Sequence, residues 1–253
     1  MLIDSHCHIY LEDFKDDLET VMQRAFQAGL KKFYMPAIDS TTNGLMFELE
    51  EKYPGTCIAM MGLHPCSVKE NFNEELEEVE QYLKQRRFAA VGEIGLDFYW
   101  SQEFIKQQYE SLHRQINLSI EHDLPIVIHT RNAMQETIDV VSEYKGKARG
   151  IFHCFGGSAD DAQRIIELGY YLGIGGVVTY KNSGLASVLE QIDLKHIVLE
   201  TDAPYLTPVP FRGKRNECSY LSLVQEKIAA IKNISPDEVA SITSENALKV
   251  FAL

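Results

Sequence analysis

Short apolar segments rich in β-branched residues alternate with amphipathic segments along the whole chain. The apolar segments have the length of buried β-strands, and the amphipathic ones repeat their apolar positions at helical spacing. Helices are predicted for residues 18–29, 71–86, 103–123 and 160–169, where Gly29 and Gly169 stand at the position of a C-terminal cap. Strands are predicted for residues 2–6, 31–38, 57–64, 88–97, 125–131, 150–155, 170–178 and 196–202.

Eight strands separated by helices in 253 residues predict an α/β fold of the TIM type, a (β/α)8 barrel in regular or distorted form. A doubly wound open sheet is the alternative, because the number of strands alone does not show that the sheet closes. The sequence contains neither an internal repeat nor a linker of low complexity. We therefore expect one domain over residues 1–253.

The composition indicates a soluble protein of a reducing compartment, and we expect it in the cytoplasm. No apolar run reaches the length of a membrane span, and no basic leader precedes the first patterned residues. The five cysteines are scattered and form no CxxC pair, which argues against a disulfide framework or a thiolate zinc finger.

The chain is acidic, with 24 Lys and Arg residues against 37 Asp and Glu residues and a formal net charge of −13. Such a surface is a poor general binder of polyanions. If the protein acts on nucleic acid, bound metal or a local basic loop must provide the attraction. The acidic segment 71–86 is explained more simply as the solvated face of a helix.

Polar side chains gather where the predicted strands end, which is the end of a (β/α)8 barrel that holds its active site. Five of the eight histidines lie there, whereas His113, His122 and His196 fall in helices or at a strand entrance. A single histidine in such a place is better interpreted as structural, but this convergence is not. The residues at these strand ends are His6, His8, His64, Glu93, Asp97, His129, Arg131, His153, Glu200 and Asp202.

Imidazoles and carboxylates buried together are costly unless cations neutralise the carboxylates and accept the nitrogen lone pairs. A donor set without thiolate suits Zn²⁺, Mn²⁺, Fe²⁺ or Mg²⁺. Strand alternation should turn Cys7 and Cys154 away from the site, as small packing residues. The donors exceed what one ion needs, so we expect two ions with Glu93 between them, and metal-assisted hydrolysis by an activated water.

Several segments resemble the TatD family of metal-dependent deoxyribonucleases, within the amidohydrolase superfamily. They are "IDSHCH", "GLHP", "QRRFAAVGE" leading into "VGEIGLDFY", "PIVIHTRNA", "HCFGG" and "LETDAPYLTPVPFRGKRNE", in the order of the family and spanning residues 3–217. "HCFGG", "ETDAPYL" and "RGKRNE" are specific, whereas "DSHCH" fits any amidohydrolase. Glu93 stands where many other members of the superfamily use a modified lysine, which favours the nuclease-like branch.

The resemblance implies a metal site and a substrate site. One ion would be held by His6, His8, Glu93 and Asp202, and the second by Glu93, His129 and His153. His64 and Arg131 match positions near the phosphate of the substrate, so Glu93, Asp202, His64 and Arg131 are the expected catalytic residues. Cys218 is a departure, because the family commonly has proline just after this last motif.

The last motif also contains a local basic loop, with Arg212, Lys214 and Arg215 just beyond Asp202. On the sequence alone, phosphate contact and simple solvation of these charges are about equally supported. Barrels of this type often place phosphate sites after their last two strands, which favours substrate binding modestly.

These observations predict a metal-dependent phosphodiesterase, a deoxyribonuclease of the 3′-exonuclease type with two divalent ions (Mg²⁺, Mn²⁺ or Zn²⁺) and DNA as substrate. We expect a monomer without a membrane partner. One alternative is an ester or amide hydrolase, acting for example on an aminoacyl ester of tRNA. The other is a barrel that binds metal without catalysis.

Overall fold

All eight predicted strands are present in the computed structural model, which describes residues 1–252. Each lies within or beside its predicted range, and every pairing between them is parallel. The strands are β1 (Leu2–Asp4), β2 (Leu30–Met35), β3 (Cys57–Ala59), β4 (Val91–Asp97), β5 (Ile126–Arg131), β6 (Gly150–Phe152), β7 (Tyr170–Ile174) and β8 (Ile197–Leu199).

The helices alternate with the strands, and the four predicted ones are among them. The helices are α1 (Leu18–Gln27), α2 (Ser40–Lys52), α3 (Phe72–Gln85), α4 (Ile105–Glu121), α5 (Met134–Ser142), α6 (Ala159–Glu167), α7 (Leu185–Gln191), α8 (Leu221–Lys232) and α9 (Pro236–Val250). Short 3-10 helices are η1 (Glu12–Phe14), η2 (Pro65–Ser67), η3 (Gly176–Thr179), η4 (Leu194–His196) and η5 (Cys218–Tyr220).

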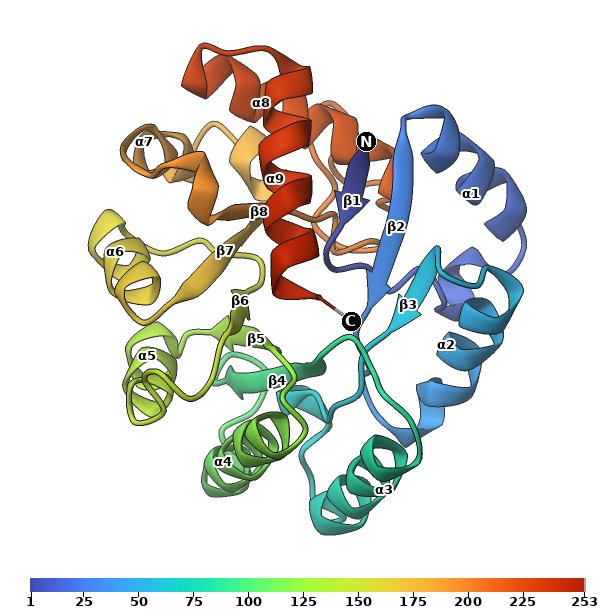
Figure 1. Cartoon of the computed structure of the whole chain (residues 1–253), viewed down its shortest axis with the longest axis vertical. Helices are drawn as coiled ribbons and strands as arrows, with labels where there is room; N and C mark the ends of the chain where they lie inside the picture. The colour runs from blue at the N-terminus through green and yellow to red at the C-terminus, as the bar shows by residue number, and fades with distance from the viewer. Residues whose placement is uncertain (253) are drawn as a thin grey trace.

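The strands form a ring with helices around its outside, as Figure 1 shows. They belong to two sheets, β1-β2-β3 and β4-β5-β6-β7-β8, which meet at two places. A single bridge pairs Met61 with Val91 between β3 and β4. Between β8 and β1, the backbone N–H of Ser5 donates to the carbonyl of Leu199 at 2.9 Å. The predicted barrel is therefore confirmed in a distorted form, and the open doubly wound sheet is not observed.

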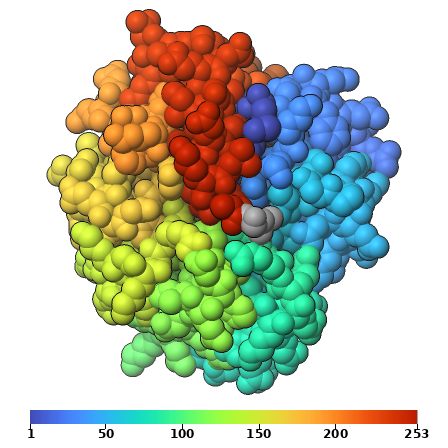
Figure 2. All heavy atoms as spheres, viewed as in Figure 1, coloured from blue at the N-terminus to red at the C-terminus, as the bar shows by residue number. Residues whose placement is uncertain are grey.

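Helix α9 covers the end of the ring at which the strands begin. Asn246 donates through Nδ2 to the carbonyls of Leu194 and Ile197 at the entrance of β8. The ring of Phe251, just after the helix, stacks on that of Tyr34 with centroids 4.0 Å apart. Figure 2 shows the side chains of α9 filling this end of the molecule. The carboxyl ends of the strands therefore open on the opposite face, away from the viewer.

The ends of the helices follow local sequence signals. Helix α6 begins at a capping box in which Ser158 and Asp161 satisfy each other's backbone N–H groups. Gly29 and Gly169 follow α1 and α6 with a φ of 91°, a conformation that favours glycine, as predicted. No helix within residues 1–252 is both long and apolar enough to cross a membrane.

Candidate metal centre

The six predicted metal ligands meet at the carboxyl ends of the strands. Glu93 lies inside β4 and His129 inside β5, whereas His153 follows the last residue of β6 directly. Strand β1 ends at Asp4, so His6 and His8 lie beyond it, yet their Nε2 atoms converge at 3.3 Å. Asp202 follows β8 and is the remaining member of the set.

Glu93 is at the centre, and its two carboxylate oxygens face different groups. Oε2 lies 3.1 Å from Nε2 of His6 and 3.3 Å from Nε2 of His8. Oε1 lies 2.9 Å from Nδ1 of His129 and 3.0 Å from Nε2 of His153. The first group includes Asp202, whose Oδ1 lies 3.6 Å from Nε2 of His6. Glu93 is common to both groups, but His153 also forms a group with His6 and Asp202, so the assignment of the ligands to two ions stays a prediction.

A glycine allows β4 and β5 to approach closely at this point. Gly95 pairs with His129 across the two strands and has a φ of 152°. A Cβ atom at this position would overlap the carbonyl of His129. Glycine is therefore needed here to keep Glu93 and His129 at contact distance.

Hydrogen bonds on the outer nitrogens orient two of the imidazoles. Nε2 of His129 lies 2.9 Å from Oδ2 of Asp97, which accepts its proton, and Nδ1 lies 2.9 Å from Oε1 of Glu93, where it would bind an ion in its deprotonated form. The hydroxyl of Tyr10 donates to the carbonyl of Pro36 at 2.6 Å. That hydroxyl therefore accepts from Nδ1 of His8 at 3.1 Å, so the lone pair of His8 is on Nε2. Such outer partners commonly fix the tautomer of ligating histidines.

Glu200 is the carboxylate beside His153. Its buried Oε1 lies 3.2 Å from Nδ1 of His153 and accepts the backbone N–H of Cys154 at 2.5 Å. A Cβ atom on Gly173 would overlap the Glu200 carboxylate, so this glycine makes room for it. Nε2 of His153, 3.0 Å from Oε1 of Glu93, is the nitrogen that can bind an ion.

His64 differs from these histidines, because the nitrogen that faces the site carries its proton. Its Nδ1 accepts the backbone N–H of Cys66 at 3.0 Å, so neutral His64 carries its proton at Nε2. Burial lowers the pKa of His64, which favours this neutral form. Nε2 lies 3.3 Å from Oε1 of Glu93, close enough to belong to the same cluster as His129. This N–H is a donor toward the site, and the contact of His64 with substrate stays a prediction.

The electrostatics of the cluster favour a bound cation. Burial would raise the pKa of Glu93, but its imidazole neighbours, His153 first, lower it well below its ordinary value. Burial lowers the pKa of His6, so its ring is neutral. Burial also raises the pKa of Asp202 to about 6. Burial would lower the pKa of His153, but Glu93 and Glu200 raise it well above its ordinary value, so an ion would take the place of a proton there. Imidazole nitrogens and carboxylate oxygens facing one point are the donors that divalent ions accept, and these residues fit such ions.

An open pocket of about 800 Å³ leads from solvent to this cluster. Its wall includes Glu93 and Asp202 as well as His64 and Arg131, the two residues expected to contact the phosphate. This volume lies within the range of about 300–1,000 Å³ that is typical of small-molecule sites. We refer to it as the reaction pocket.

The cysteines follow the prediction only in part. Cys7 is fully buried, and its Sγ lies 3.9 Å from the carbonyl of Tyr34, away from the ligands, as predicted. The prediction for Cys154 is wrong, because this residue lines the reaction pocket. It lies beyond the end of β6 with a φ of 47°, so the alternation of a strand does not apply to it. Cys218 is buried, with its Sγ 3.9 Å from Oγ1 of Thr201.

The three cations of the predicted basic loop have different surroundings. Arg215 forms a bidentate ion pair with Asp17, at 2.9 and 2.7 Å. The guanidinium of Arg212 lies over the ring of Tyr180 at 4.2 Å, and Nζ of Lys214 lies 5.7 Å from the ring of Phe211. Among the described residues, the wall of the reaction pocket includes none of the three.

Sequence reasoning placed Asp97 and Glu200 at the strand ends but gave them no role. Their roles depend on contacts to His129 and His153, residues that lie 32 and 47 positions away in the chain. The contact of Tyr10 with His8 is more local in the sequence, because only one residue separates them. No local pattern distinguishes such partners from ordinary polar residues.

The family model described as "TatD related DNase" matches residues 3–252 of the chain. A Bacillus subtilis protein named "Uncharacterized metal-dependent hydrolase YabD" is 37% identical, over 100% of both chains. A Danio rerio protein named "Putative deoxyribonuclease tatdn3" is 31% identical, covering 99% of this chain and 97% of that one.

Solved structures agree with the fold. The crystal structure of the TatD homologue YjjV from Escherichia coli K12 superposes with a TM-score of 0.94 and 31% identity, covering 100% of this chain and 98% of that chain. The structure of a hydrolase of the TatD family from Entamoeba histolytica has a TM-score of 0.87 at 22% identity, covering 99% and 97%. The second likeness supports the barrel fold alone.

Proposed function

The chain belongs to the family of TatD-related DNases and is a metal-dependent hydrolase, and from this premise we propose that it cleaves phosphodiester bonds of DNA. The proposed reaction is that of a 3′-exonuclease, which removes nucleotides from the end of a strand. The relative from Danio rerio, whose name describes a deoxyribonuclease, supports this class of substrate.

The observation that carries the proposal is the division of contacts around Glu93. One carboxylate oxygen faces His6 and His8, and the other faces His129 and His153. A carboxylate that is shared in this way, with Asp202 on one side, is suited to a pair of divalent ions. We assign His6, His8, Glu93 and Asp202 to one ion, and Glu93, His129 and His153 to the other.

When bound, such ions (Mg²⁺, Mn²⁺ or Zn²⁺) would supply Lewis acidity toward a water molecule and toward the oxygens of the reacting phosphate. The protein supplies the orientation. Asp97 accepts the proton at Nε2 of His129, and Glu200 lies 3.2 Å from Nδ1 of His153, so both favour ring orientations in which the inner nitrogens can bind an ion. His64 carries its proton at Nε2, and Arg131 lines the same pocket, so both would be able to hold a phosphate oxygen.

The charge of the chain fits a substrate that enters at one place. With a formal charge of −13, the chain is a poor general binder of DNA. Arg131 at the pocket, with Arg212 and Lys214 on the loop after β8, would attract a strand locally. Arg215 is paired with Asp17 and contributes less net charge. The single domain over residues 1–253, the monomeric state and the cytoplasmic location remain predictions.

The test is a product assay with metal-stripped protein on single- and double-stranded DNA, before and after addition of Mg²⁺ or Mn²⁺. We expect release of mononucleotides only after metal is returned. Turnover of aminoacyl esters or cyclic amides without nucleotide release would favour the ester or amide hydrolase. Absence of turnover on every such substrate, by protein shown to contain metal, would favour a barrel that binds metal without catalysis.

A further inference from the structure

Exposed aromatic and apolar side chains gather at the mouth of the reaction pocket. Trp100, Tyr205 and Leu206 are exposed by 69%, 51% and 39% and line the pocket. Tyr99, exposed by 53%, contacts Arg131 of the same wall. Scattered apolar residues on a surface need no explanation, but a group of them around a site indicates a ligand with apolar faces.

These side chains come from two loops on opposite sides of the ring. Tyr99 and Trp100 follow β4, whereas Tyr205 and Leu206 follow β8, which lies four strands away among eight (Figure 1). The ring of Tyr205 has its centroid 6.1 Å from that of the ligand His8. A flat group that enters between the two loops therefore reaches the metal centre.

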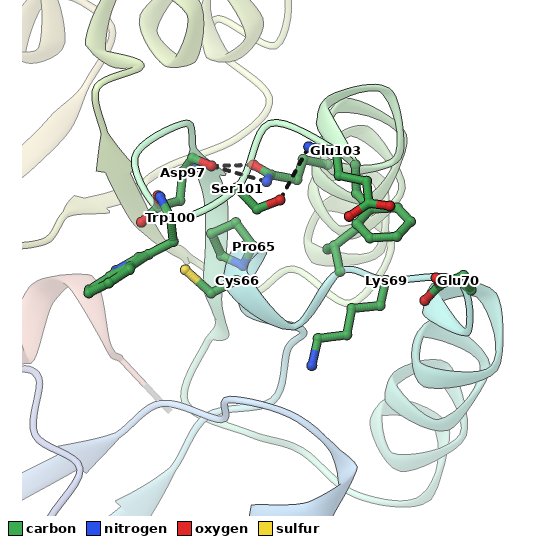
Figure 3. A pocket seen from close by; sticks show the side chains of 11 residues that line it. Pro65, Cys66, Lys69, Glu70, Asp97, Trp100, Ser101 and Glu103 are labelled. Atoms are coloured by element: carbon green, nitrogen blue, oxygen red, sulfur yellow. Dashed lines mark hydrogen bonds between the residues drawn. The ribbon is translucent and has the colours of Figure 1, made fainter.

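Trp100 stands where the reaction pocket adjoins a smaller one. The smaller pocket has a volume of about 290 Å³, and we refer to it as the side pocket. Trp100, Cys66 and Asp97 line both pockets. Figure 3 shows Trp100 and Cys66 at one end of the side pocket, with Lys69 and Glu70 at the other. The indole is therefore within reach of a substrate that extends outward from the metal centre.

The backbone that carries Trp100 is tied to the metal centre. Oδ1 of Asp97 accepts the backbone N–H groups of Tyr99 at 2.9 Å and Trp100 at 3.1 Å. Oδ2 of the same carboxylate lies 2.9 Å from His129. The guanidinium of Arg131 stacks over Tyr99 at 3.8 Å and lies 5.2 Å from the ring of Trp100. An aromatic face and a positive charge are thus held side by side.

We propose that Trp100 is a substrate-positioning residue that stacks on the base of a nucleotide adjoining the scissile phosphodiester, while Arg131 faces its phosphate. This inference rests on the proposed function. The flat aromatic face, the neighbouring guanidinium and the adjoining metal ligands together match a nucleotide, which has a flat base and an anionic phosphate. Stacking on an exposed aromatic ring is the usual means of binding unpaired bases without reading their sequence.

The chain offers a direct readout, because Trp100 is its only tryptophan. The probe is a short single strand of DNA, compared with a strand of equal length and charge that has abasic residues throughout. With metal-stripped protein, the base-bearing strand should quench the tryptophan fluorescence in a saturable manner, and the abasic strand should not. Equal quenching by both strands, or quenching by neither, would overturn the proposal.

A kinetic comparison separates stacking from a structural role. With metal-loaded protein, Trp100→Ala should lower kcat/KM about 10-fold more on the base-bearing strand than on the abasic one, mainly through KM. Trp100→Phe should retain most of the preference, and Leu248→Ala, an exposed apolar change on α9, should leave it unchanged. An equal loss on both strands contradicts the proposal. If wild-type protein cleaves neither strand, the proposed function itself fails.

Discussion

The carboxylate of Asp97 holds the imidazole of His129, with Oδ2 2.9 Å from Nε2. Its other oxygen accepts the backbone N–H groups of Tyr99 and Trp100. Burial would raise the pKa of Asp97, but the hydrogen bond with His129 lowers it below its ordinary value. The carboxylate is therefore charged. One side chain thereby orients a proposed metal ligand and the backbone of the aromatic residues beside the pocket.

Asp97→Asn should weaken metal binding although Asp97 touches no ion in our assignment. The amide can donate to Nε2 of His129, which moves the imidazole proton to Nδ1, the atom that faces Glu93. Loss of such a partner typically costs about 10–100-fold in metal affinity or activity. Titration of metal-stripped protein with Mn²⁺ measures the affinity, with Glu121→Gln, an exposed change on α4, as control. An affinity equal to that of wild type would remove Asp97 from the account.

Glu93→Gln should lower metal content and activity together. The substitution keeps the shape of the side chain but removes the negative charge that both ligand sets share. We expect the loss to affect both ions, in contrast to Asp202→Asn, which should affect chiefly the ion on the side of His6 and His8. Mass spectrometry of the intact protein under native conditions counts the ions. Two ions retained by Glu93→Gln would show that Glu93 is not a shared ligand.

The cations of the loop after β8 should separate into two kinds. Neutralising Arg212 and Lys214 should leave metal content unchanged and weaken DNA binding, with a flatter dependence on salt. Each lost phosphate contact should reduce the slope of log K against log[salt] by about 0.7 for a single strand. Arg215→Gln should change the slope less, because its charge is paired with Asp17.

Arg131→Gln is the comparison for these loop variants. Arg131 lines the reaction pocket, so its replacement should lower turnover more than affinity for DNA. An unchanged slope and affinity after loss of Arg212 and Lys214 would mean that these charges are only solvated.

The ion pair between Arg24 and Glu217 should make stability depend on pH in acid. Burial would raise the pKa of Glu217, but hydrogen bonds from Arg24 and Ser219 lower it below its ordinary value of 4.5. A depressed folded pKa gives stability that is complete above about pH 4.5 and is lost as the pH falls through the folded value. The free energy of unfolding of metal-stripped Arg24→Gln, measured in urea, should therefore be lower than that of wild type at pH 7. The difference should be smaller at pH 3.

The control for this prediction is Arg87→Gln, an exposed arginine two residues beyond the end of α3. Its effect on unfolding should be small at both values of pH. A constant difference between Arg24→Gln and wild type across the acid range would show that Glu217 titrates alike in the folded and unfolded chain.

The sequence predicts the strands and the gathering of candidate ligands at one end of them because both follow from local pattern. His6, Glu93 and His153 each stand at or near the end of an apolar segment, and the topology of a barrel brings such ends together. The tautomers could not be predicted in this way, because they depend on distant partners such as Asp97 for His129. The position of Cys154 depends on a φ of 47°, which no alternation rule contains.

The same reasoning explains why the basic loop was predicted only in part. Charge and position in the sequence show that Arg215 is cationic and lies after the last strand. They do not show that the carboxylate of Asp17, 198 positions away, accepts hydrogen bonds from both terminal nitrogens of Arg215. The exposed aromatic side chains at the mouth of the reaction pocket could not be predicted either, because the exposure of Trp100 is a property of the folded surface.

The central claim, that Glu93 is shared by two ions in this barrel, is tested most directly by anomalous diffraction from crystals of the protein loaded with Mn²⁺. We predict two peaks about 3.5–4 Å apart, each within bonding distance of a different oxygen of Glu93. One peak should also contact His6, His8 and Asp202, and the other should contact His129 and His153. A single peak, or a pair of peaks of which one does not contact Glu93, would contradict the account.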